Sequence, residues 1–233
     1  MSCTVRENLF TFVVVALFGT FFTLPTLAQD TESDAFDGLV AVEGAKADIL
    51  AIDPEADFSV YQRIIILDPY VAFIKNWRRD VNRDTRSASS RVSNSDMEKI
   101  KVDVAAMFKE VFTEKLQADD GFVITDETGD DVLIIRPAII DLDITAPDTM
   151  SPGRSRTYVA TAGAATIYVE LFDSVSGAII GRAADRRTAR QNRGRVSWST
   201  GVTNAREARR MMGIWADQLK SFLEDHYPIG AQQ

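Results

Sequence analysis

Few residues of this 233-residue sequence have a type and spacing that could support catalysis. His226 is its single histidine, so a Ser-His-Asp or Cys-His device would have to use this residue. It follows the closing amphipathic segment, where the partial negative charge of a helix C-terminus stabilises a protonated imidazole. This position favours a capping role for His226 over a catalytic one.

Two carboxylates, Asp141 and Asp143, are weak candidates for a metal site. They stand two residues apart on a predicted strand, so both side chains should point to one face, and Asp148 could join them. Three carboxylates can bind Ca²⁺ or Mg²⁺, but the spacing is not that of an EF-hand and no nearby histidine suggests zinc. We therefore predict solvated carboxylates, no metal and no cofactor. A hydrolase based on Asp141 and Asp143 is the least favoured alternative, because no base or nucleophile accompanies them.

Arginine is concentrated between Met150 and Arg210, where eleven arginines face four acidic residues. The guanidinium group is a planar fork that suits carboxylates and phosphates, which favours a surface for an anionic small molecule, glycan or lipid headgroup. In the alternative interpretation, which the charge asymmetry between the two ends of the chain favours, these side chains pair with the acidic arm and the first helix of the same chain. We expect two polar loops, residues 147–156 and 188–203, to form the ligand or partner surface. The side chains expected there are Arg154, Arg156, Arg193, Arg195 and Trp198.

Other function classes with recognisable signatures find no support in the sequence. It contains no glycine-rich phosphate loop, nucleophile elbow, pair of metal-binding histidines or dinucleotide fingerprint. The net charge of -8 and the few aromatic residues among the arginines argue against nucleic-acid binding. The sequence therefore predicts a non-enzymatic protein that binds another component, without revealing a biochemical activity.

Residues 1–28 have the pattern of a secretory signal peptide. The run from Leu9 to Leu24 carries no charge, and Thr26-Leu27-Ala28 places small residues where a signal peptidase reads them. The run is shorter than the ~20 residues that span a bilayer comfortably, so we expect cleavage after Ala28, no remaining transmembrane span and a periplasmic location in a Gram-negative bacterium. An uncleaved anchor is the alternative. Cys3, the single cysteine, precedes the run, so the mature chain has no disulfide.

The mature chain is predicted to consist of an arm, one domain and a short tail. Residues 29–57 carry many acidic groups against a single Lys46, and such a charge excess resists collapse, which predicts an acidic flexible arm. Residues 58–228 contain the periodic apolar segments of a single α+β domain, and residues 229–233 form the tail.

A β-hairpin between Gly163 and Arg187 organises the predicted domain. Two sets of residues alternate here with the period of a strand that has two different faces. They are Ala165, Ile167, Val169 and Leu171 on one face and Thr166, Tyr168, Glu170 and Phe172 on the other. Residues 173–177 then supply a turn, in which Gly177 can adopt a positive φ. Further strands are expected at residues 64–67, 122–125 and 132–144.

Two amphipathic helices complete the prediction. The first begins at Ser95, which has a glutamate three residues later as in a capping box, and ends at Gly121 as a left-handed residue. Residues 78–95 lack periodicity and are expected to form a solvated loop. The second helix runs from a similar capping box at Asn204 to about residue 225. Its expected inward residues are Ala208, Met211, Met212, Trp215, Leu219, Phe222 and Leu223. The predicted fold class is α+β, a mostly antiparallel sheet packed on one side by two long helices.

Two segments of the sequence resemble a known family. They are Leu133-Ile-Ile-Arg-Pro-Ala-Ile-Ile-Asp-Leu and Ala165-Thr-Ile-Tyr-Val-Glu-Leu-Phe-Asp-Ser, with Gly177 following. With the early isoleucine-rich strand and the long helix, they resemble the bacterial envelope family called domain of unknown function 3313 (DUF3313), over roughly residues 61 to 227. The resemblance implies export in Gram-negative bacteria, but no catalytic residues. The order of the elements is also similar to that of small periplasmic accessory domains, so we expect an envelope accessory or interaction protein. With the arginines, this predicts an envelope protein or anionic envelope component as partner. Many members look like lipoproteins, and this chain departs from them because no cysteine follows its apolar leader.

Overall fold

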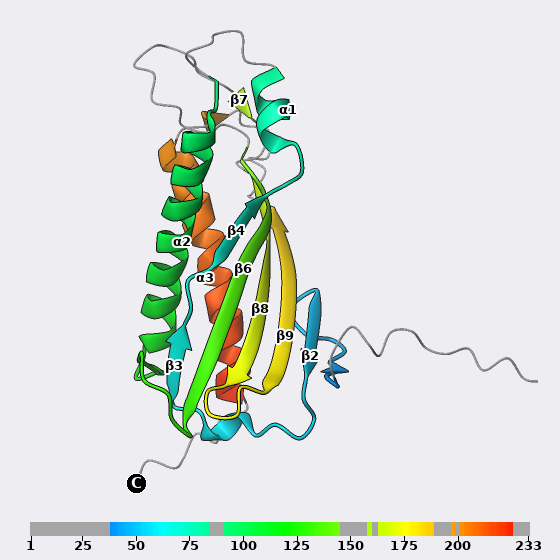
Figure 1. The fold of residues 1–233 in the computed structure, drawn as a ribbon, viewed down its shortest axis with the longest axis vertical. Coiled ribbons are helices and arrows are strands. Elements are labelled where there is room, and N and C mark those ends of the chain that lie inside the picture. Colours follow the sequence, from blue (N-terminus) through cyan, green and yellow to red (C-terminus); the bar gives the residue numbers. More distant parts are fainter. Residues whose placement is uncertain are drawn as a thin grey trace, which may run out of the picture. The chain divides into compact units, whose positions relative to one another are not determined.

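The structure, a computed structural model, describes residues 38–83, 91–144, 158–159, 163–188, 197–198 and 201–225. These residues form one eight-stranded sheet, a separate two-stranded sheet and three α-helices (Figure 1). The helices are α1 (Trp77–Arg83), α2 (Asn94–Gln117) and α3 (Gly201–Asp225). The strands of the large sheet are β1 (Val40–Ala41), β2 (Ile49–Ile52), β3 (Arg63–Ile66), β4 (Tyr70–Phe73), β5 (Val123–Ile124), β6 (Val132–Asp143), β8 (Ala164–Asp173) and β9 (Ile179–Thr188). The small sheet pairs β7 (Tyr158–Val159) with β10 (Ser197–Trp198).

The large sheet is mostly antiparallel, as the sequence predicts. Its strand order is β1-β2-β9-β8-β6-β3-β5, and β4 also pairs with β6. The long strands β6, β8 and β9 are antiparallel to one another, whereas the short strands β3 and β4 run parallel to β6 and β5 runs parallel to β3. The strand directions are therefore mixed, with antiparallel pairing between the long central strands.

Strands β8 and β9 form the predicted hairpin. The apolar positions of β8 are buried, and they are Ala165, Ile167, Val169 and Leu171. In the turn, the Asp173 carboxylate accepts hydrogen bonds from the amides of Val175 and Ser176 at 3.2 and 2.7 Å. Gly177 adopts a φ of 68°, the left-handed conformation that a glycine takes without a Cβ penalty. The prediction of this hairpin from the alternating pattern is confirmed.

Residues 38–57 do not form a flexible arm, and the prediction is wrong for this part of the chain. Strand β2 pairs with β9 over its full length, and β1 adds a further strand to the sheet. Ala51 is completely buried. The acidic residues flank a short apolar strand, and its sheet hydrogen bonds and buried surface outweigh the net charge of the segment. Residues 29–37 lie outside the described residues.

Helix α2 begins at Asn94, with Ser93 as its N-cap. The Ser93 hydroxyl accepts a 3.1 Å hydrogen bond from the amide of Asp96, whose carboxylate accepts a 2.8 Å bond from the Ser93 amide. The predicted capping box at Ser95 is therefore wrong by two residues. The error arises because Ser93 and Ser95 both precede an acidic residue by three positions, so the motif occurs twice in overlapping registers.

The other two helices differ from the prediction at their starts. Helix α1 lies in the stretch expected to be a loop, and its buried Trp77 donates a 3.2 Å hydrogen bond to the carbonyl of Ile144. This anchor is a tertiary contact that local periodicity does not reveal. Helix α3 begins at Gly201, so Asn204 lies within the helix and the predicted capping box there is wrong. The helix ends at Asp225, as predicted.

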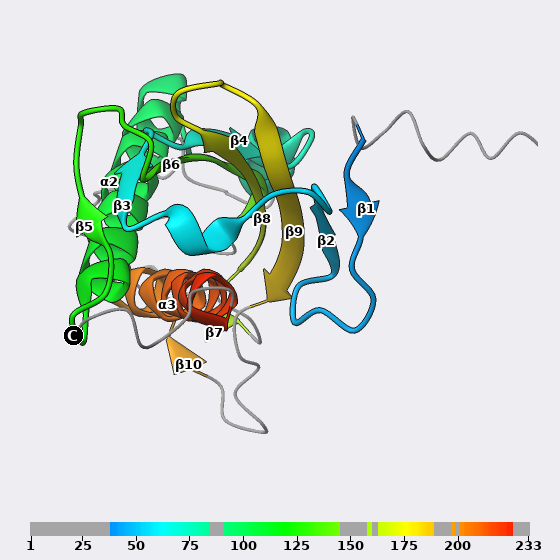
Figure 2. The same cartoon turned by 90° about the horizontal axis from the view of Figure 1, so that it is seen from below.

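One hydrophobic cluster joins the helices to the sheet. It includes buried residues of α2, α3, β3, β6 and β8, among them Ile64, Phe108, Phe112, Ile135, Met212 and Leu223. Figure 2 shows α3 on the concave side of the curved strands β6, β8 and β9. Arg209 of α3 also pairs with Glu110 of α2. No helix in the described part of the chain is long and apolar enough to cross a membrane.

Candidate functional site

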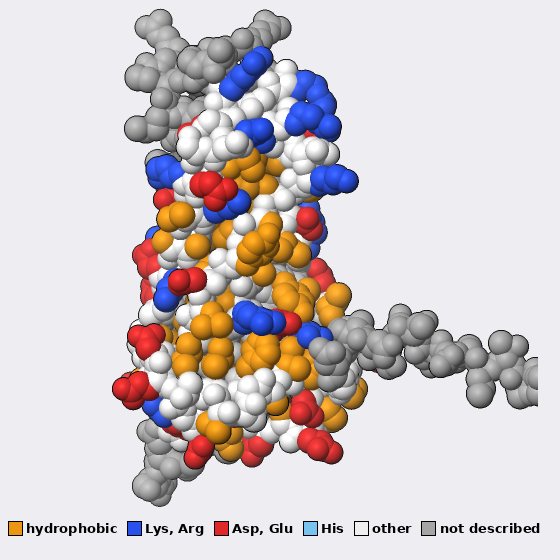
Figure 3. Space-filling model, viewed as in Figure 1, with side chains coloured by type: hydrophobic (Ala, Val, Ile, Leu, Met, Phe, Trp, Pro, Cys, Tyr) orange, Lys and Arg blue, Asp and Glu red, His pale blue; other side chains and the backbone are white. Residues whose placement is uncertain are grey.

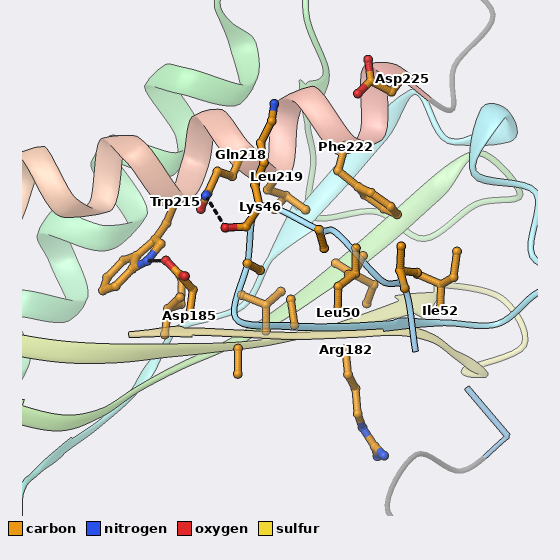
Figure 4. A pocket seen from close by; sticks show the side chains of 18 of the residues that line it. Lys46, Leu50, Ile52, Arg182, Asp185, Trp215, Gln218, Leu219, Phe222 and Asp225 are labelled. Carbon is orange, nitrogen blue, oxygen red and sulfur yellow. Dashed lines mark hydrogen bonds between the residues drawn. The ribbon is translucent and has the colours of Figure 1, made fainter. Parts of the chain in front are cut away.

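An apolar cavity of about 300 Å³ lies between the sheet and α3 (Figure 4). Its floor is the inner face of β8, β9 and β2, and its roof is α3. The segment from Val42 to Ala47 rises from β2 towards α3 and closes one side. The apolar lining includes Leu50, Val169, Leu171, Trp215, Leu219 and Phe222.

Small residues on β9 help to leave this space open. Its inner face carries Gly181, Ala183 and Asp185, opposite Leu171, Val169 and Ile167 of β8. Gly181 and Ala183 fill less volume than the branched residues opposite them on β8. The cavity is therefore deepest next to β9. A longer side chain at Ala183, which lines the cavity, would occupy part of it.

The side of the cavity is closed by a contact between residues far apart in the sequence. The carbonyl of Lys46 accepts a 3.1 Å hydrogen bond from Nε2 of Gln218 on α3. The carboxylate of Asp48, which precedes β2, accepts a 2.8 Å hydrogen bond from the amide of Arg186 on β9. The two bonds attach the start of β2 to the roof and to the floor.

A buried polar pair lies at one end of the cavity. Nε1 of Trp215 donates a 2.7 Å hydrogen bond to Oδ2 of Asp185, and both residues are buried. Nε of Arg187 lies 2.7 Å from the same oxygen but without hydrogen-bond alignment, so this contact is electrostatic. Among the described residues that line the cavity, most are aliphatic or aromatic, and none is serine, cysteine, histidine or tyrosine.

The ionisable residues around the cavity are mostly acidic. They are Glu43, Lys46, Arg182, Asp185 and Asp225. Figure 4 shows the Arg182 side chain directed away from the cavity. On the opposite face of the sheet, its Nε lies 3.2 Å from Oε1 of Glu170. Asp225 is also directed away from the cavity, so two carboxylates, Glu43 and Asp185, and the ammonium group of Lys46 are left around it.

A second polar cluster, centred on Glu170, lies on that opposite face. The buried carboxylate accepts hydrogen bonds from Arg136, Arg182 and Tyr168. Burial acts to raise the pKa of Glu170, but the hydrogen bonds from Arg136, Tyr168 and Arg182 outweigh it and hold the pKa below its ordinary value. The Arg136 guanidinium also lies 4.8 Å from the ring centre of Phe172. Figure 3 shows hydrophobic side chains around the few charged groups of this face.

The structure leaves the predicted ligand or partner surface untested. Four of its residues, Arg154, Arg156, Arg193 and Arg195, lie outside the described residues. Trp198 lies in β10, where its backbone pairs with Tyr158 of β7. The surface therefore stays a prediction.

Asp141 and Asp143 lie at the end of β6, where the pairing with β8 shifts register after Ile140. Asp141 adopts a φ of 51°, so a bulge interrupts the alternation on which the same-face prediction relied. Within the part of the chain that the structure describes, no three His, Cys, Asp or Glu residues come together in a way that could hold a metal ion. Asp148 and His226 lie outside that part.

Several described arginines pair with carboxylates of the same chain. They are Arg182, Arg187, Arg209 and Arg210. Arg209 donates two 3.0 Å hydrogen bonds to Glu110 and so links α3 to α2. These hydrogen bonds and the charge of Arg209 lower the pKa of Glu110. Arg209 therefore pairs with the first long helix, as the intramolecular alternative predicts, whereas Arg182, Arg187 and Arg210 pair with carboxylates of β8, β9 and α3.

Sequence similarity assigns this fold to a family. Residues 28–219 match the family described as "Protein of unknown function (DUF3313)". The chain belongs to this family. The match confirms the resemblance seen in the sequence and extends it to the segment that contains β1 and β2. No curated protein shows significant similarity to this DUF3313 chain.

Three solved structures resemble the DUF3313 chain at very low sequence identity. A PelC dodecamer from Paraburkholderia phytofirmans is 13% identical, with 70% of this chain and 91% of that chain covered and a TM-score of 0.35. A Xanthomonas campestris protein of family DUF330 is 9% identical, with coverages of 74% and 89% and a TM-score of 0.38. A neuraminyllactose-binding hemagglutinin homolog from Helicobacter pylori is 9% identical, with coverages of 70% and 84% and a TM-score of 0.26. Such values transfer neither an activity nor an assembly to the DUF3313 chain.

Sequence reasoning missed the cavity, although two signals for it were present. Gly181 and Ala183 are small residues at alternating positions of a strand, which marks a face with room above it. The apolar run from Ile49 to Ile52 interrupts the acidic segment and marks a strand. Trp215 was predicted to point inward, but its partner Asp185 has no signal in the local pattern.

Proposed function

We propose that this protein is a non-enzymatic binding domain whose site is the cavity between the sheet and α3. The observation that carries the proposal is an apolar cavity of about 300 Å³ whose lining is mostly aliphatic and aromatic. Small-molecule sites are concave, mostly apolar and supplied with a few polar groups, and this volume lies at the lower end of their range. Asp185 and Gln218 supply such polar groups here. We also propose that the two long helices, α2 and α3, pack side by side on one face of the large sheet.

An uncharged apolar probe tests the proposal. The fluorescence of N-phenyl-1-naphthylamine rises in apolar surroundings, so a titration with the full chain should show saturable enhancement. The Ala183→Leu variant should bind the probe about tenfold more weakly, because the added atoms occupy the floor of the cavity.

The Ala138→Leu variant is the matched control. Ala138 is a half-buried residue of β6 that does not line the cavity, so probe binding should stay unchanged. Thermal unfolding of both variants verifies that they fold. Equal probe affinity in wild type and Ala183→Leu would refute the cavity as the site.

We also propose that the protein acts in the periplasm. The signal-peptide pattern of residues 1–28 supports this location. Mass spectrometry of periplasmic and cytosolic fractions tests it, with a mature N-terminus at Gln29 expected in the periplasm. An intact Met1 on protein found in the cytosol would contradict export.

A second candidate function is the binding of an anionic envelope component through the loops 147–156 and 188–203. The observation that favours it is the pairing of Tyr158 with Trp198, because β7 follows the first loop and β10 lies in the second. Flotation with phosphatidylglycerol and phosphatidylcholine vesicles tests it. Binding to the anionic vesicles alone, lost when the loop arginines are replaced by glutamate, is the expected result. The four positions to replace are Arg154, Arg156, Arg193 and Arg195.

A further inference from the structure

We infer that the ligand of the cavity is a single unbranched alkyl or acyl chain with an uncharged head group. This inference rests on the proposed function, since it concerns the same cavity. It adds the shape and the charge of the ligand, which follow from separate observations on the lining.

The cavity is long and narrow. Along α3, its lining extends from Trp215 to Asp225, which corresponds to roughly 15 Å at the helical rise. Along β8, it extends from Ile167 to Leu171, roughly 14 Å at the strand rise. Across the sheet, the inner side chains come from the three neighbouring strands β2, β9 and β8, and the outer two lie roughly 10 Å apart at the strand spacing, which is less than the length of the lining. A slot of about 300 Å³ with this length accommodates an extended chain better than a compact ring system.

The apolar lining follows the length of the slot. Trp215, Leu219 and Phe222 lie at successive positions along one face of α3 (Figure 4). Leu50 and Ile52 of β2 also line the cavity. A flexible chain can lie against each of these groups in turn, and every methylene it buries adds to the affinity.

The charges around the slot disfavour an anionic head group. Figure 4 shows Arg182 and Asp225 directed away from the cavity, and Glu43 and Lys46 are exposed, so the buried Asp185 is the charged group that a ligand inside the slot would meet. The positive charge of Arg187 lies beside Asp185, but Arg187 does not line the cavity. The buried Asp185 already accepts a hydrogen bond from Trp215. The negative charge of a ligand carboxylate beside these groups would be repelled, and only part of that repulsion would be offset. A hydroxyl head group, in contrast, can donate a hydrogen bond to a carboxylate oxygen without adding a charge.

A chain-length series tests the inference by displacement of N-phenyl-1-naphthylamine from the full chain. For n-alkanols, we expect the affinity to rise about fourfold with each added methylene until the slot is full, and then to level off. In the Ala183→Leu variant, the affinity should stop rising at a shorter chain length than in wild type. In the Ala138→Leu variant, the affinities should match those of wild type. Each n-alkanol should bind at least about tenfold more tightly than the alkanoate of the same length at pH 7.

The outcomes separate this inference from the proposed function. An affinity for n-alkanols that does not change with chain length would refute a linear chain as the ligand. Tighter binding of 1-adamantanol than of n-decanol, which has the same number of carbons, would refute it as well. Alkanoates that bind as tightly as the alkanols would overturn the uncharged head group. In both cases, probe binding that is sensitive to Ala183→Leu would leave the cavity proposal standing. If no apolar probe binds, the proposed function fails and this inference fails with it.

Discussion

The indole nitrogen of Trp215 donates a 2.7 Å hydrogen bond to Oδ2 of Asp185, which joins α3 to the inner face of β9. Both residues are at least nine-tenths buried. Arg187, two residues further along the same strand, supplies a positive charge 2.7 Å from the same oxygen. A carboxylate in these surroundings is stabilised by its two neighbours, and each neighbour depends on it in return.

Replacement of Asp185 by leucine should therefore lower the free energy of unfolding. Nε1 of Trp215 would lose its hydrogen-bond acceptor, which costs about 1–3 kcal/mol, and the half-buried guanidinium of Arg187 would lose its counter-charge. Asp185→Asn should cost less, because the amide oxygen still accepts from the indole. Urea denaturation monitored by circular dichroism measures both values.

Asp103 provides the control for this experiment. It forms an exposed ion pair with Lys99 on α2, so Asp103→Leu should change the stability by about 0.5 kcal/mol or less. A loss for Asp185→Leu no larger than that for Asp103→Leu would show that the pair does not hold α3 to the sheet.

Glu170 should make the stability of the fold depend on acidic pH. Its pKa in the folded chain lies below the ordinary value of 4.5, because the hydrogen bonds from Arg136, Tyr168 and Arg182 outweigh the effect of burial. The ionised carboxylate therefore stabilises the fold above about pH 4.5, and this contribution disappears as the pH falls through the folded-state pKa. At pH 7, Glu170→Gln should lower the free energy of unfolding by about 1–3 kcal/mol.

The test compares wild type and Glu170→Gln by urea denaturation between pH 7 and pH 3. The difference in stability should be largest at pH 7 and should shrink with acidification below about pH 4.5. Glu55→Gln, at an exposed position, should stay close to wild type throughout. A wild-type advantage over Glu170→Gln that does not vary with pH would contradict the linkage.

The sequence was informative where a structural element follows from its own residues. Strand β8 alternates between apolar and polar residues over most of its length, and Gly177 marks the turn, so the hairpin was predictable from β8, the turn and the apolar start of β9. The inward position of Trp215 likewise follows from the helical periodicity of its segment.

The cavity could not be predicted in this way, because it depends on pairing between distant segments. Strand β2 has four residues within an acidic stretch, and its place in the sheet is decided by β9, with Ile49 opposite Ala184. The bond from Gln218 to Lys46 closes the side only after that pairing has formed. The amino-acid composition of residues 29–57 is dominated by acidic groups, and such an average does not show the four-residue strand β2 within the segment.

Ser93 should contribute more to the stability of α2 than Ser95 does. The Ser93 hydroxyl accepts a hydrogen bond from the Asp96 amide at the helix start, so Ser93→Ala should cost about 1 kcal/mol. Ser95 lies inside the first turn, where alanine is the better helix former, so Ser95→Ala should cost less. Thermal unfolding of the two variants decides between the overlapping motifs. A greater loss for Ser95→Ala would mean that the helix begins two residues later.

Substitution of Gly121 and of Gly177 should change the stability by different amounts, because each position requires glycine for a different physical reason. A Cβ on Gly121 would lie 2.2 Å from the carbonyl oxygen of Leu116, which already accepts a hydrogen bond from the amide of Phe122. Gly177 has open space around it and a φ of 68°, so its constraint is backbone conformation alone. Gly177→Ala should cost about 1 kcal/mol, and Gly121→Ala should cost more because the backbone after α2 must shift.

Asparagine separates the two causes, since it tolerates the left-handed conformation better than alanine does. Gly177→Asn should regain part of the stability that Gly177→Ala loses. Gly121→Asn should regain none, because its Cβ meets the same oxygen. Chemical denaturation of the four variants measures these differences. The left-handed residues after α2 are Asp119 and Asp120, so the prediction of a left-handed Gly121 from the sequence is wrong. Rescue by asparagine at position 121 would refute the steric explanation.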